Sequence, residues 1–406
     1  MAATSPFPRP SQPEPGPGGL VNPTGSQAIG ATGEGWKIVE LHPGKGGMKE
    51  EDRRHAAARL MCDQHPDPLV AGERFLGAAE LLGMDTRLLW GAQEQSPAFR
   101  SPGRRFAQAI LAVPGSGGTA MLFLSPPPSP TGAWRDEVAR PKTPELGQAR
   151  EERALGQRVA LIETACGYLA STSPQGLLVQ ALVDPPAPNR AGAQQVIRAF
   201  EHAGFLRLGD LAYLRRPVPL PSRARPAKPA ATGGLPAGVR VQSVADLRLG
   251  GASGEEIDAW LLAALERSYV DTKDCPELCG LRSPTDVLES HKAVGQLDER
   301  LWLIAFDEEG AQGCALLSPN RDGDCVELVY LGLGTRLRGR GLGRRLMEMS
   351  IATMEDLLRA GAIPLSMHGG LTCAVDTRND PAMRLYEGLG FKSFSVRVPL
   401  VKRLGV

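Results

Sequence analysis

Residues 335–347, TRLRGRGLGRRLM, bring five arginines and three glycines together in thirteen positions. They follow the apolar run VELVYLGLG (326–334), which predicts a strand, and they lead into a pattern typical of a helix. A helix start presents unpaired N–H groups and the positive end of its dipole to anions. Glycines let a phosphate approach those amides, and arginines add charge that suits phosphate oxygens. The corner predicts an anion site, with a solvated helix start as the alternative.

Other phosphate motifs do not fit this chain. No Gly-Lys-Ser/Thr ends the corner, and its glycines have the wrong spacing for a dinucleotide fingerprint. The segment HPGKGGM (42–48) has Gly-Lys without the Ser/Thr or the upstream glycine. Cys275 and Cys279 have no second pair of ligands nearby, and two ligands do not make a zinc site. We therefore expect no metal.

The composition places the chain among globular proteins. It has 406 residues, a formal net charge of +1 and seven scattered cysteines. Near-neutral charge argues against general nucleic-acid binding, and no apolar run approaches the ~20 residues that span a bilayer. The N-terminus lacks the apolar core of a secretory signal, and the odd number of cysteines suits a reducing compartment. These features predict a cytoplasmic protein that binds neither nucleic acid nor membrane.

Two proline-rich stretches divide the chain. Residues 1–35 hold seven prolines and seven glycines with little to bury, which predicts a disordered tail. Residues 217–238 hold six prolines and read as an extended linker. We therefore expect one domain over 36–216 and a second over 239–406, each large enough for its own core.

The C-terminal half alternates strands and helices. Strands are expected over 239–246, 301–307, 313–319, 326–333, 371–377 and 394–403, and helices over 254–270, 341–360 and 380–389. Ser253 and Glu256 have the capping-box spacing at the start of the first helix. The three closely spaced central strands predict an antiparallel meander, because parallel crossovers need a dozen or more residues.

The ends of the two halves are similar. Residues 197–217 align with 383–403 as a helix, then x-Gly-Phe, then an alternating strand with basic residues at its end. This similarity predicts a divergent internal duplication, with a chance match of two helix–strand units as the alternative.

Arg338-x-x-Gly341-x-Gly343 after an antiparallel strand resembles the signature loop of the GNAT superfamily of acyl-CoA N-acyltransferases. Residues 379–391, NDPAMRLYEGLGF, resemble the second motif of that family at its usual place after the fifth strand. The resemblance covers nearly all of 239–404. It implies an α/β (α+β) chain of two tandem GNAT-like domains, each with a mixed, mostly antiparallel central sheet flanked by helices.

The resemblance also implies acetyl-CoA as the acyl donor and an amine as its acceptor. Backbone groups of the fourth strand would pair with the pantetheine arm, the loop would hold the phosphates, and Asn379 would contact the donor near its reactive end. The donor-binding set is Leu331, Gly332, Leu333, Arg338, Gly339, Arg340, Gly341, Leu342, Gly343, Arg344 and Asn379.

Two residues fall at catalytic positions of the resembled family. Tyr386 matches the general acid, a phenol that protonates the leaving thiolate, with sheet packing as the alternative. Glu327 matches the general base, with a surface role as the alternative, and an amide near Leu331 would stabilise the oxyanion. Weaker candidates are His291 and His368 as bases or substrate contacts, with satisfied or exposed histidines as the alternative. Tyr269, Asp271 and Asp274 could hold a cationic amine, with a solvated charged loop as the alternative.

The N-terminal half lacks the corner and the acid. Prolines occupy the place of the loop, and Phe200 stands where Tyr386 would be. The resemblance therefore implies a degenerate first domain, in a layout similar to mycothiol synthase, that shapes the acceptor site or forms an internal pseudo-dimer. We expect an N-acetyltransferase, monomeric or homodimeric. The alternatives are a non-catalytic acyl-CoA sensor and an interaction scaffold.

Overall fold

A computed structural model describes residues 35–41, 50–61, 67–81, 84–94, 106–127, 143–173, 175–186, 191–218, 234–320, 324–363 and 370–405. The expected disordered tail, apart from Gly35, lies outside these ranges. So do residues 219–233 of the expected linker, and His368.

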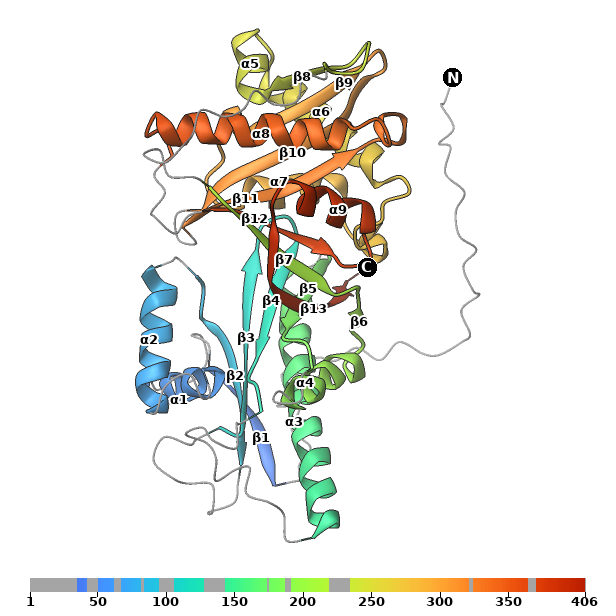
Figure 1. Cartoon of the computed structure of the whole chain (residues 1–406). Helices are drawn as coiled ribbons and strands as arrows, with labels where there is room; N and C mark the ends of the chain where they lie inside the picture. The colour runs from blue at the N-terminus through green and yellow to red at the C-terminus, as the bar shows by residue number, and fades with distance from the viewer. Residues whose placement is uncertain are drawn as a thin grey trace, which may run out of the picture.

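The N-terminal half runs from β1 to β7 and occupies the lower part of Figure 1. Its elements are β1 (Trp36–Glu40), α1 (Glu50–Leu60), α2 (Pro68–Leu81), β2 (Leu88–Glu94), β3 (Gln108–Gly115), β4 (Thr119–Leu124), α3 (Pro144–Thr172), β5 (Leu177–Val183), α4 (Ala191–His202), β6 (Leu206–Arg207) and β7 (Leu211–Pro217).

The C-terminal half runs from β8 to β13 and occupies the upper part of the same view (Figure 1). Its elements are β8 (Arg240–Ser243), α5 (Val244–Leu249), α6 (Gly254–Tyr269), η4 (Pro276–Leu278), α7 (Pro284–Lys292), η5 (Glu299–Leu301), β9 (Trp302–Asp307), β10 (Gly310–Asn320), β11 (Cys325–Leu333), η6 (Thr335–Leu337), α8 (Leu342–Arg359), β12 (Gly370–Asp376), α9 (Asp380–Gly388) and β13 (Lys392–Leu404).

Local signals in the sequence account for several of these boundaries. The capping box forms at the start of α6, since the Ser253 hydroxyl accepts from the Glu256 amide and the Glu256 carboxylate accepts from the Ser253 amide. The strand expected over 239–246 is wrong in its second half. Ser243 ends the strand because its side chain caps the short helix α5.

The expected meander is confirmed, because β9, β10 and β11 pair antiparallel in sequence order. Within the described residues the strands form one continuous sheet in the order β1-β2-β3-β4-β5-β13-β7-β12-β11-β10-β9-β8. The fourth and fifth strands of each half are parallel neighbours, β4 with β5 and β11 with β12, while the other pairs are antiparallel. Both halves therefore repeat one mixed, mostly antiparallel pattern, as the expected duplication requires.

The last strands of the two halves are exchanged. β7 of the N-terminal half pairs along β12, from Leu211 opposite Asp376 to Pro217 opposite Gly370. β13 of the C-terminal half pairs in the same way along β5, from Val398 opposite Val183 to Leu404 opposite Leu177. β7 and β13 also pair with each other at the centre of the sheet (Figure 1). Each half therefore completes the sheet of the other.

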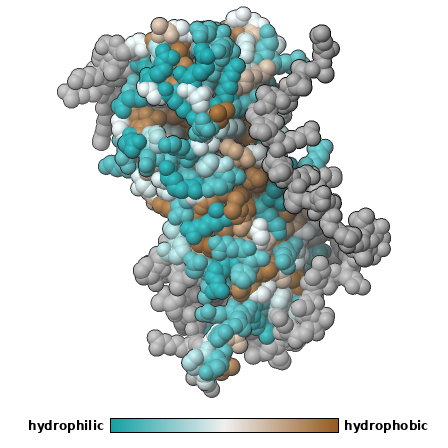
Figure 2. All heavy atoms as spheres, turned by 90° about the vertical axis from the view of Figure 1, so that its right-hand side faces the viewer, coloured by the Kyte–Doolittle hydropathy of each residue, from teal (hydrophilic) through white to brown (hydrophobic). Residues whose placement is uncertain are grey.

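The cores follow the same division. One cluster joins α3 and α4 to the strands of the N-terminal half and includes Val398 and Leu400 of the exchanged strand. Another joins α8 and α9 to β11 and β12 and includes Ala212 and Leu214 of β7. The face in Figure 2 is largely hydrophilic, with hydrophobic residues scattered over it and more frequent near its middle. The exchange thus extends from backbone pairing into side-chain packing.

Candidate active site

The corner after β11 has the backbone of an anion site. Gly339 and Gly341 adopt positive φ angles of 73° and 76°, and a Cβ on either would meet no atom within 4 Å. Gly341 caps α8 without a side-chain hydrogen bond. Because neither glycine has a side chain, the space in front of the first N–H groups of α8 stays open at these two positions.

Arg338 does not extend toward that space. Its guanidinium donates to three backbone carbonyl oxygens, those of Leu333 (2.8 Å), Ser268 (2.7 Å) and Asp271 (3.1 Å). The side chain thereby ties the end of β11 to the C-terminal end of α6. Arg338 would therefore affect a ligand by fixing the shape of the loop. The sequence had suggested a direct, forked contact of its guanidinium with phosphate.

Most of the other arginines of the corner are paired with carboxylates. Arg336 contacts Asp307, Glu308 and Glu309 in the β9–β10 turn. Arg344 and Arg345 both face Glu348 on the next turn of α8. Arg340 is exposed and makes no hydrogen bond or ion pair with the described residues. It is therefore the side chain of this group that is available for an incoming anion.

β11 and β12 separate beside this corner. They pair only at Val326 with Leu371 and at Glu327 with Thr372, although β11 continues to Leu333 along β10. The β10–β11 register shifts so that Val329 has no partner. The edge of Leu331 to Leu333 that faces away from β10 thus has no strand beside it in the described chain. A bulge and an open edge of this kind accept an extended ligand as an added strand.

Gly332 is required by its neighbours on the opposite side. A Cβ there would lie 2.5 Å from Tyr330 Oη and 2.7 Å from Ser268 Oγ. Gly343 is different, because a Cβ there would make ordinary contacts of 3.7 and 3.8 Å with Leu333 and Leu385. Gly339 and Gly341 are therefore needed for their backbone conformation, and Gly332 of β11 is needed because its neighbours leave no room for a side chain.

Glu327 is half-buried on β11, between Val326 and Leu328, which both belong to the core beneath α8 and α9. Alternation along a strand places its side chain on the opposite face of the sheet. Burial raises the pKa of this carboxyl above 4.5, and a hydrogen bond with Asn320 offsets part of that rise. A carboxylate with a raised pKa is a better proton acceptor than an exposed one.

Tyr386 on α9 is almost fully buried, and its ring centroid lies 5.4 Å from that of Phe391. Burial raises the pKa of its hydroxyl well above 10, and the neighbouring Cys373 and Asp274 raise it further. The phenol is therefore protonated at neutral pH, as an acid must be before it acts. Its membership of the core shows that packing is also part of its role.

Asn379 links the start of α9 to the loop after α6. Its side-chain oxygen caps α9 by accepting from the Ala382 amide at 3.3 Å. Its side chain also hydrogen-bonds Asp274, whose carboxylate accepts from the amide of Asp376 at 3.0 Å. Burial raises the pKa of Asp274. Asp274, a weak candidate from the sequence, thus lies in the electrostatic surroundings of Tyr386.

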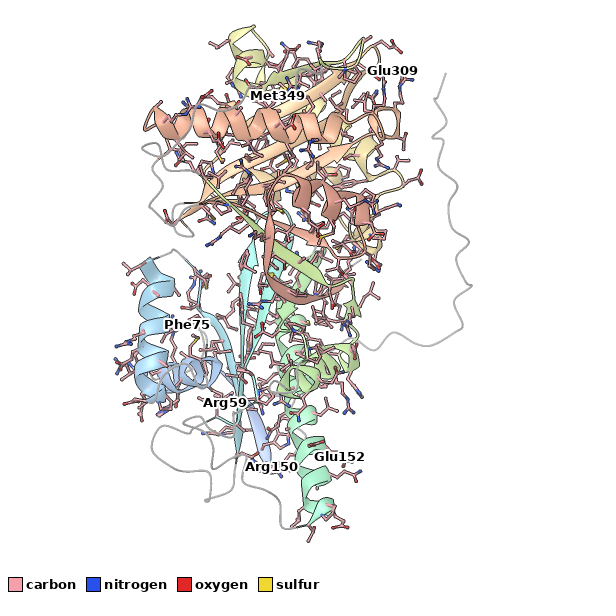
Figure 3. The ribbon with its side chains drawn as sticks, in the orientation of Figure 1. Arg59, Phe75, Arg150, Glu152, Glu309 and Met349 are labelled. Atoms are coloured by element: carbon pink, nitrogen blue, oxygen red, sulfur yellow. The ribbon has the colours of Figure 1, made fainter. Side chains whose placement is uncertain are left out.

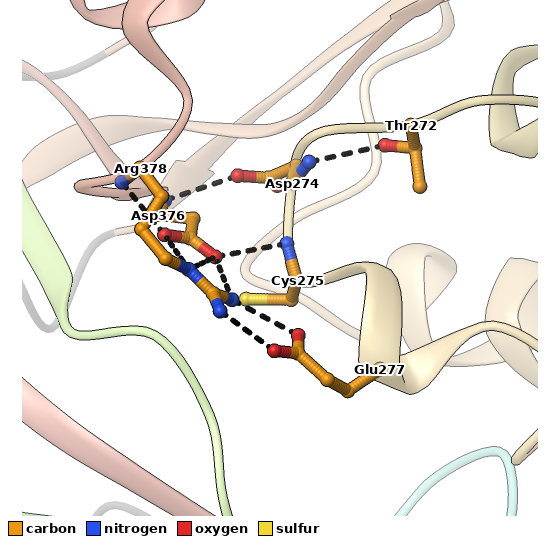
Figure 4. Close-up of polar contacts among 6 residues, drawn as sticks. All are labelled: Thr272, Asp274, Cys275, Glu277, Asp376 and Arg378. Carbon is orange, nitrogen blue, oxygen red and sulfur yellow. Dashed lines mark hydrogen bonds and ion pairs between the residues drawn. The ribbon is translucent and has the colours of Figure 1, made fainter.

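The residues around Asp274 form a network that sequence reasoning missed (Figure 4). Arg378 donates to Asp376 and, through both terminal nitrogens, to Glu277 at 2.7 and 2.9 Å. The amide of Cys275 also donates to Asp376. Burial raises the pKa of the Cys275 thiol to about 12. Hydrogen bonds and ion pairs of Asp376 and Arg378 thus hold this loop on the end of β12.

An aromatic group lies on the other side of β11. Tyr330 shares a 2.7 Å hydrogen bond with Ser268 and packs against Tyr269 and His291, with ring centroids 5.9 and 5.3 Å away. Burial, with the charge of Arg282, lowers the pKa of His291 to about 4. His291 is therefore neutral at physiological pH, and its buried Nε2 has no hydrogen-bond partner among the described residues.

The N-terminal half touches this region through the turn between β3 and β4. Arg282 donates to the carbonyl oxygen of Gly117 at 2.6 Å, and Ser290 donates to that of Ser116 at 2.8 Å. Gly117 has a positive φ of 63°, and a Cβ there would collide with the Asp286 carbonyl. The turn therefore fixes α7, the helix that carries His291.

Comparison with known proteins agrees with this geometry. Residues 265–391 match the model of the Acetyltransferase (GNAT) family. No curated protein sequence matches the chain. Within the described part of the chain, no helix has the length and apolarity to cross a membrane, and no group of three or more His, Cys, Asp or Glu side chains could hold a metal ion.

Similar solved structures extend over both halves. A GCN5-related N-acetyltransferase from Sphaerobacter thermophilus is 16% identical, with a TM-score of 0.45, and the match covers 91% of this chain and 97% of that one. A tandem GNAT protein from the clavulanic acid biosynthesis pathway is 14% identical, with a TM-score of 0.42, and the match covers 91% and 99%. Neither finding concerns mycothiol synthase, so that similarity in layout stays a prediction. The family match begins at the end of α6 and ends just after α9, so this part of the C-terminal half is similar to a GNAT acetyltransferase domain.

Proposed function

We propose that the protein is an acetyl-CoA-dependent N-acetyltransferase, with its catalytic domain in 239–406 and a degenerate domain in 36–216. The observation that carries this proposal is the continuity of two features. The unpaired edge of Leu331 to Leu333 leads directly into the open glycine corner at the start of α8. Acetyl-CoA has an extended pantetheine arm that leads to a pyrophosphate. The arm matches the unpaired strand edge, and the pyrophosphate matches the free amides that follow it.

The donor-binding residues follow from that placement. Backbone groups of Leu331, Gly332 and Leu333 would pair with the pantetheine arm. The amides of Gly339, Arg340, Gly341, Leu342, Gly343 and Arg344, with the Arg340 side chain, would hold the phosphates. Arg338 shapes the loop through its three carbonyl contacts, and Asn379 orders the start of α9.

The proposed chemistry is direct attack of an amine on the thioester. Glu327 takes the proton that the ammonium loses, directly or through water. An amide of β11 near Leu331 stabilises the oxyanion, and Tyr386 gives its proton to the departing thiolate. Glu327 is the last residue of β11 that pairs with β12, just before the strands separate, and it lies on the sheet face opposite the core that contains Tyr386.

The test is calorimetric titration of acetyl-CoA into the full chain, followed by release of coenzyme A with a panel of primary amines. One site per chain and turnover with an amine would support the enzyme. Binding without turnover by any amine would favour the acyl-CoA sensor. No binding would overturn both readings and leave the scaffold.

Arg340 and Arg338 form a matched pair for the corner. We expect Arg340→Ala to weaken acetyl-CoA binding several-fold without changing the melting temperature, because it removes one exposed charged contact worth ~1–2 kcal/mol. Arg338→Ala should lower the melting temperature as well, since it removes three hydrogen bonds to backbone carbonyls. Titration calorimetry and thermal unfolding check both. Unchanged affinity in both variants would mean that the corner does not bind the donor.

Glu327→Gln should remove the acid limb of the pH–rate profile and lower kcat. In the wild type that limb should lie above pH 4.5, because burial raises the pKa of Glu327. The folded protein binds this proton more tightly than the unfolded chain, so stability falls as pH rises from 4.5 through the raised pKa. Glu327→Gln should therefore gain stability relative to wild type across that range. An unchanged limb, with the exposed Glu255→Gln as control, would remove Glu327 from the mechanism.

A further inference from the structure

The helix α3 carries an arginine in its buried face. Arg158 is only 2% exposed, and it belongs to the stripe that packs α3 on the sheet. It makes no hydrogen bond or ion pair in the described chain, and its Nε is fully buried without a partner. An ion pair or hydrogen bonds normally accompany a buried charge, because its desolvation is otherwise uncompensated.

No carboxylate acts on this guanidinium. Its pKa is lowered to about 9 by burial and then by the positive charge of Arg59, and nothing raises it. Glu94, whose carboxylate does contact α3, is bound to Arg153 at 2.5 Å and Gln157 at 2.7 Å. Arg158 therefore carries a charge that no described carboxylate neutralises.

Arg59 contributes to this potential from another helix. It is fully buried on α1, where α1 lies against the strands (Figure 3). It donates to the carbonyl oxygens of Ala107 and Pro126 at 2.6 and 2.8 Å and to Gln108 Oε1 at 3.3 Å. Pro126 lies just after β4. The positive charge is thus fixed at the end of the fourth strand of this half.

That place corresponds to the glycine corner of the other half. Six buried positions of α8 match six of α3 one for one at constant spacing, namely Leu342, Leu346, Met347, Ser350, Ile351 and Met354 with Gln157, Leu161, Ile162, Ala165, Cys166 and Leu169. In this match Arg158 stands where Gly343 stands in α8. α3 begins at Pro144, well before this point, so its backbone N–H groups here are bonded within the helix. A guanidinium replaces the free amides.

We propose that the N-terminal half holds a small oxyanion, a carboxylate or a phosphate group, on the guanidinium of Arg158. The forked donors of arginine suit either group. This site is distinct from the corner at α8 and does not depend on the proposed acetyl transfer.

The test is thermal unfolding of the full chain and of Arg158→Met, with sodium chloride, sodium phosphate or sodium acetate at equal ionic strength. In chloride, Arg158→Met should melt at the same temperature as wild type or about 2–4 °C higher, because it removes an uncompensated buried charge. Phosphate or acetate should then raise the melting temperature of wild type by about 5 °C at a hundredfold excess over its dissociation constant. The same anion should raise the melting temperature of Arg158→Met by less.

The other results are equally informative. A gain with phosphate alone would assign the site to a phosphate group, and a gain with acetate alone would assign it to a carboxylate. Equal gains in both proteins, or none with either anion, would overturn the site. Arg158→Gln provides a second neutral variant if Arg158→Met fails to fold, and Arg74→Met removes an exposed arginine of the same half as control. Lower melting temperatures of both Arg158 variants in chloride would show that protein groups already satisfy the guanidinium.

Discussion

Tyr386→Phe should lower kcat by roughly 10²-fold and leave the affinity for acetyl-CoA unchanged, because general acid catalysis typically contributes that much. The substitution removes only the hydroxyl. The ring contact with Phe391 and the place of the side chain in the core both remain. Steady-state kinetics with a saturating amine, beside calorimetric titration of acetyl-CoA, separates the two quantities.

Tyr330→Phe is the matched control for Tyr386. Its hydroxyl is also shielded from solvent, burial also raises its pKa, and it shares its hydrogen bond with Ser268. We expect this variant to lose some stability with the hydrogen bond to Ser268, whose hydroxyl keeps its bond to the Leu265 carbonyl oxygen, while kcat changes little. Full activity of Tyr386→Phe would assign that tyrosine to packing alone. A similar loss in both variants would point to a general effect of burial on the site.

Cutting the chain between the halves should not release them. Each half donates its last strand to the other, so a protease site placed within 219–233 should give two fragments that elute together and keep the activity of the intact chain. Size-exclusion chromatography before and after cleavage measures this. Fragments that separate without denaturant would contradict the exchange.

The halves produced separately should behave differently. A fragment that begins at 234 leaves β12 with an unpaired edge, because β7 is missing. Exposed strand edges pair with other chains. We therefore expect this fragment to form dimers or aggregates, in which β13 of a copy takes the place of β7, and co-expression with residues 1–218 should restore a single heterodimer. A monomeric, active 234–406 fragment would show that β7 is dispensable.

Side chains in the candidate site show where sequence reasoning ends. The glycines of the corner could be read from the sequence, because positive φ angles and a helix start are local properties. The direction of each arginine could not. Arg338 turns to the carbonyls of Ser268 and Asp271 besides that of nearby Leu333, and Arg336 turns to the β9–β10 turn. Apart from Leu333, these partners come from segments distant in the sequence. A charged motif predicts the sign of a site, while neighbours decide which charges remain available.

The sequence by itself determined most elements of the C-terminal half, its meander and the glycine corner. Periodicity, caps and turn residues are encoded within a few positions, so they can be read without contacts. Only the tertiary structure decided the exchange of β7 and β13, the network around Asp376 and the isolation of Arg158. The alternating pattern of a strand does not predict which sheet edge the strand joins. A buried charge without a partner can be recognised only when the groups around it are known.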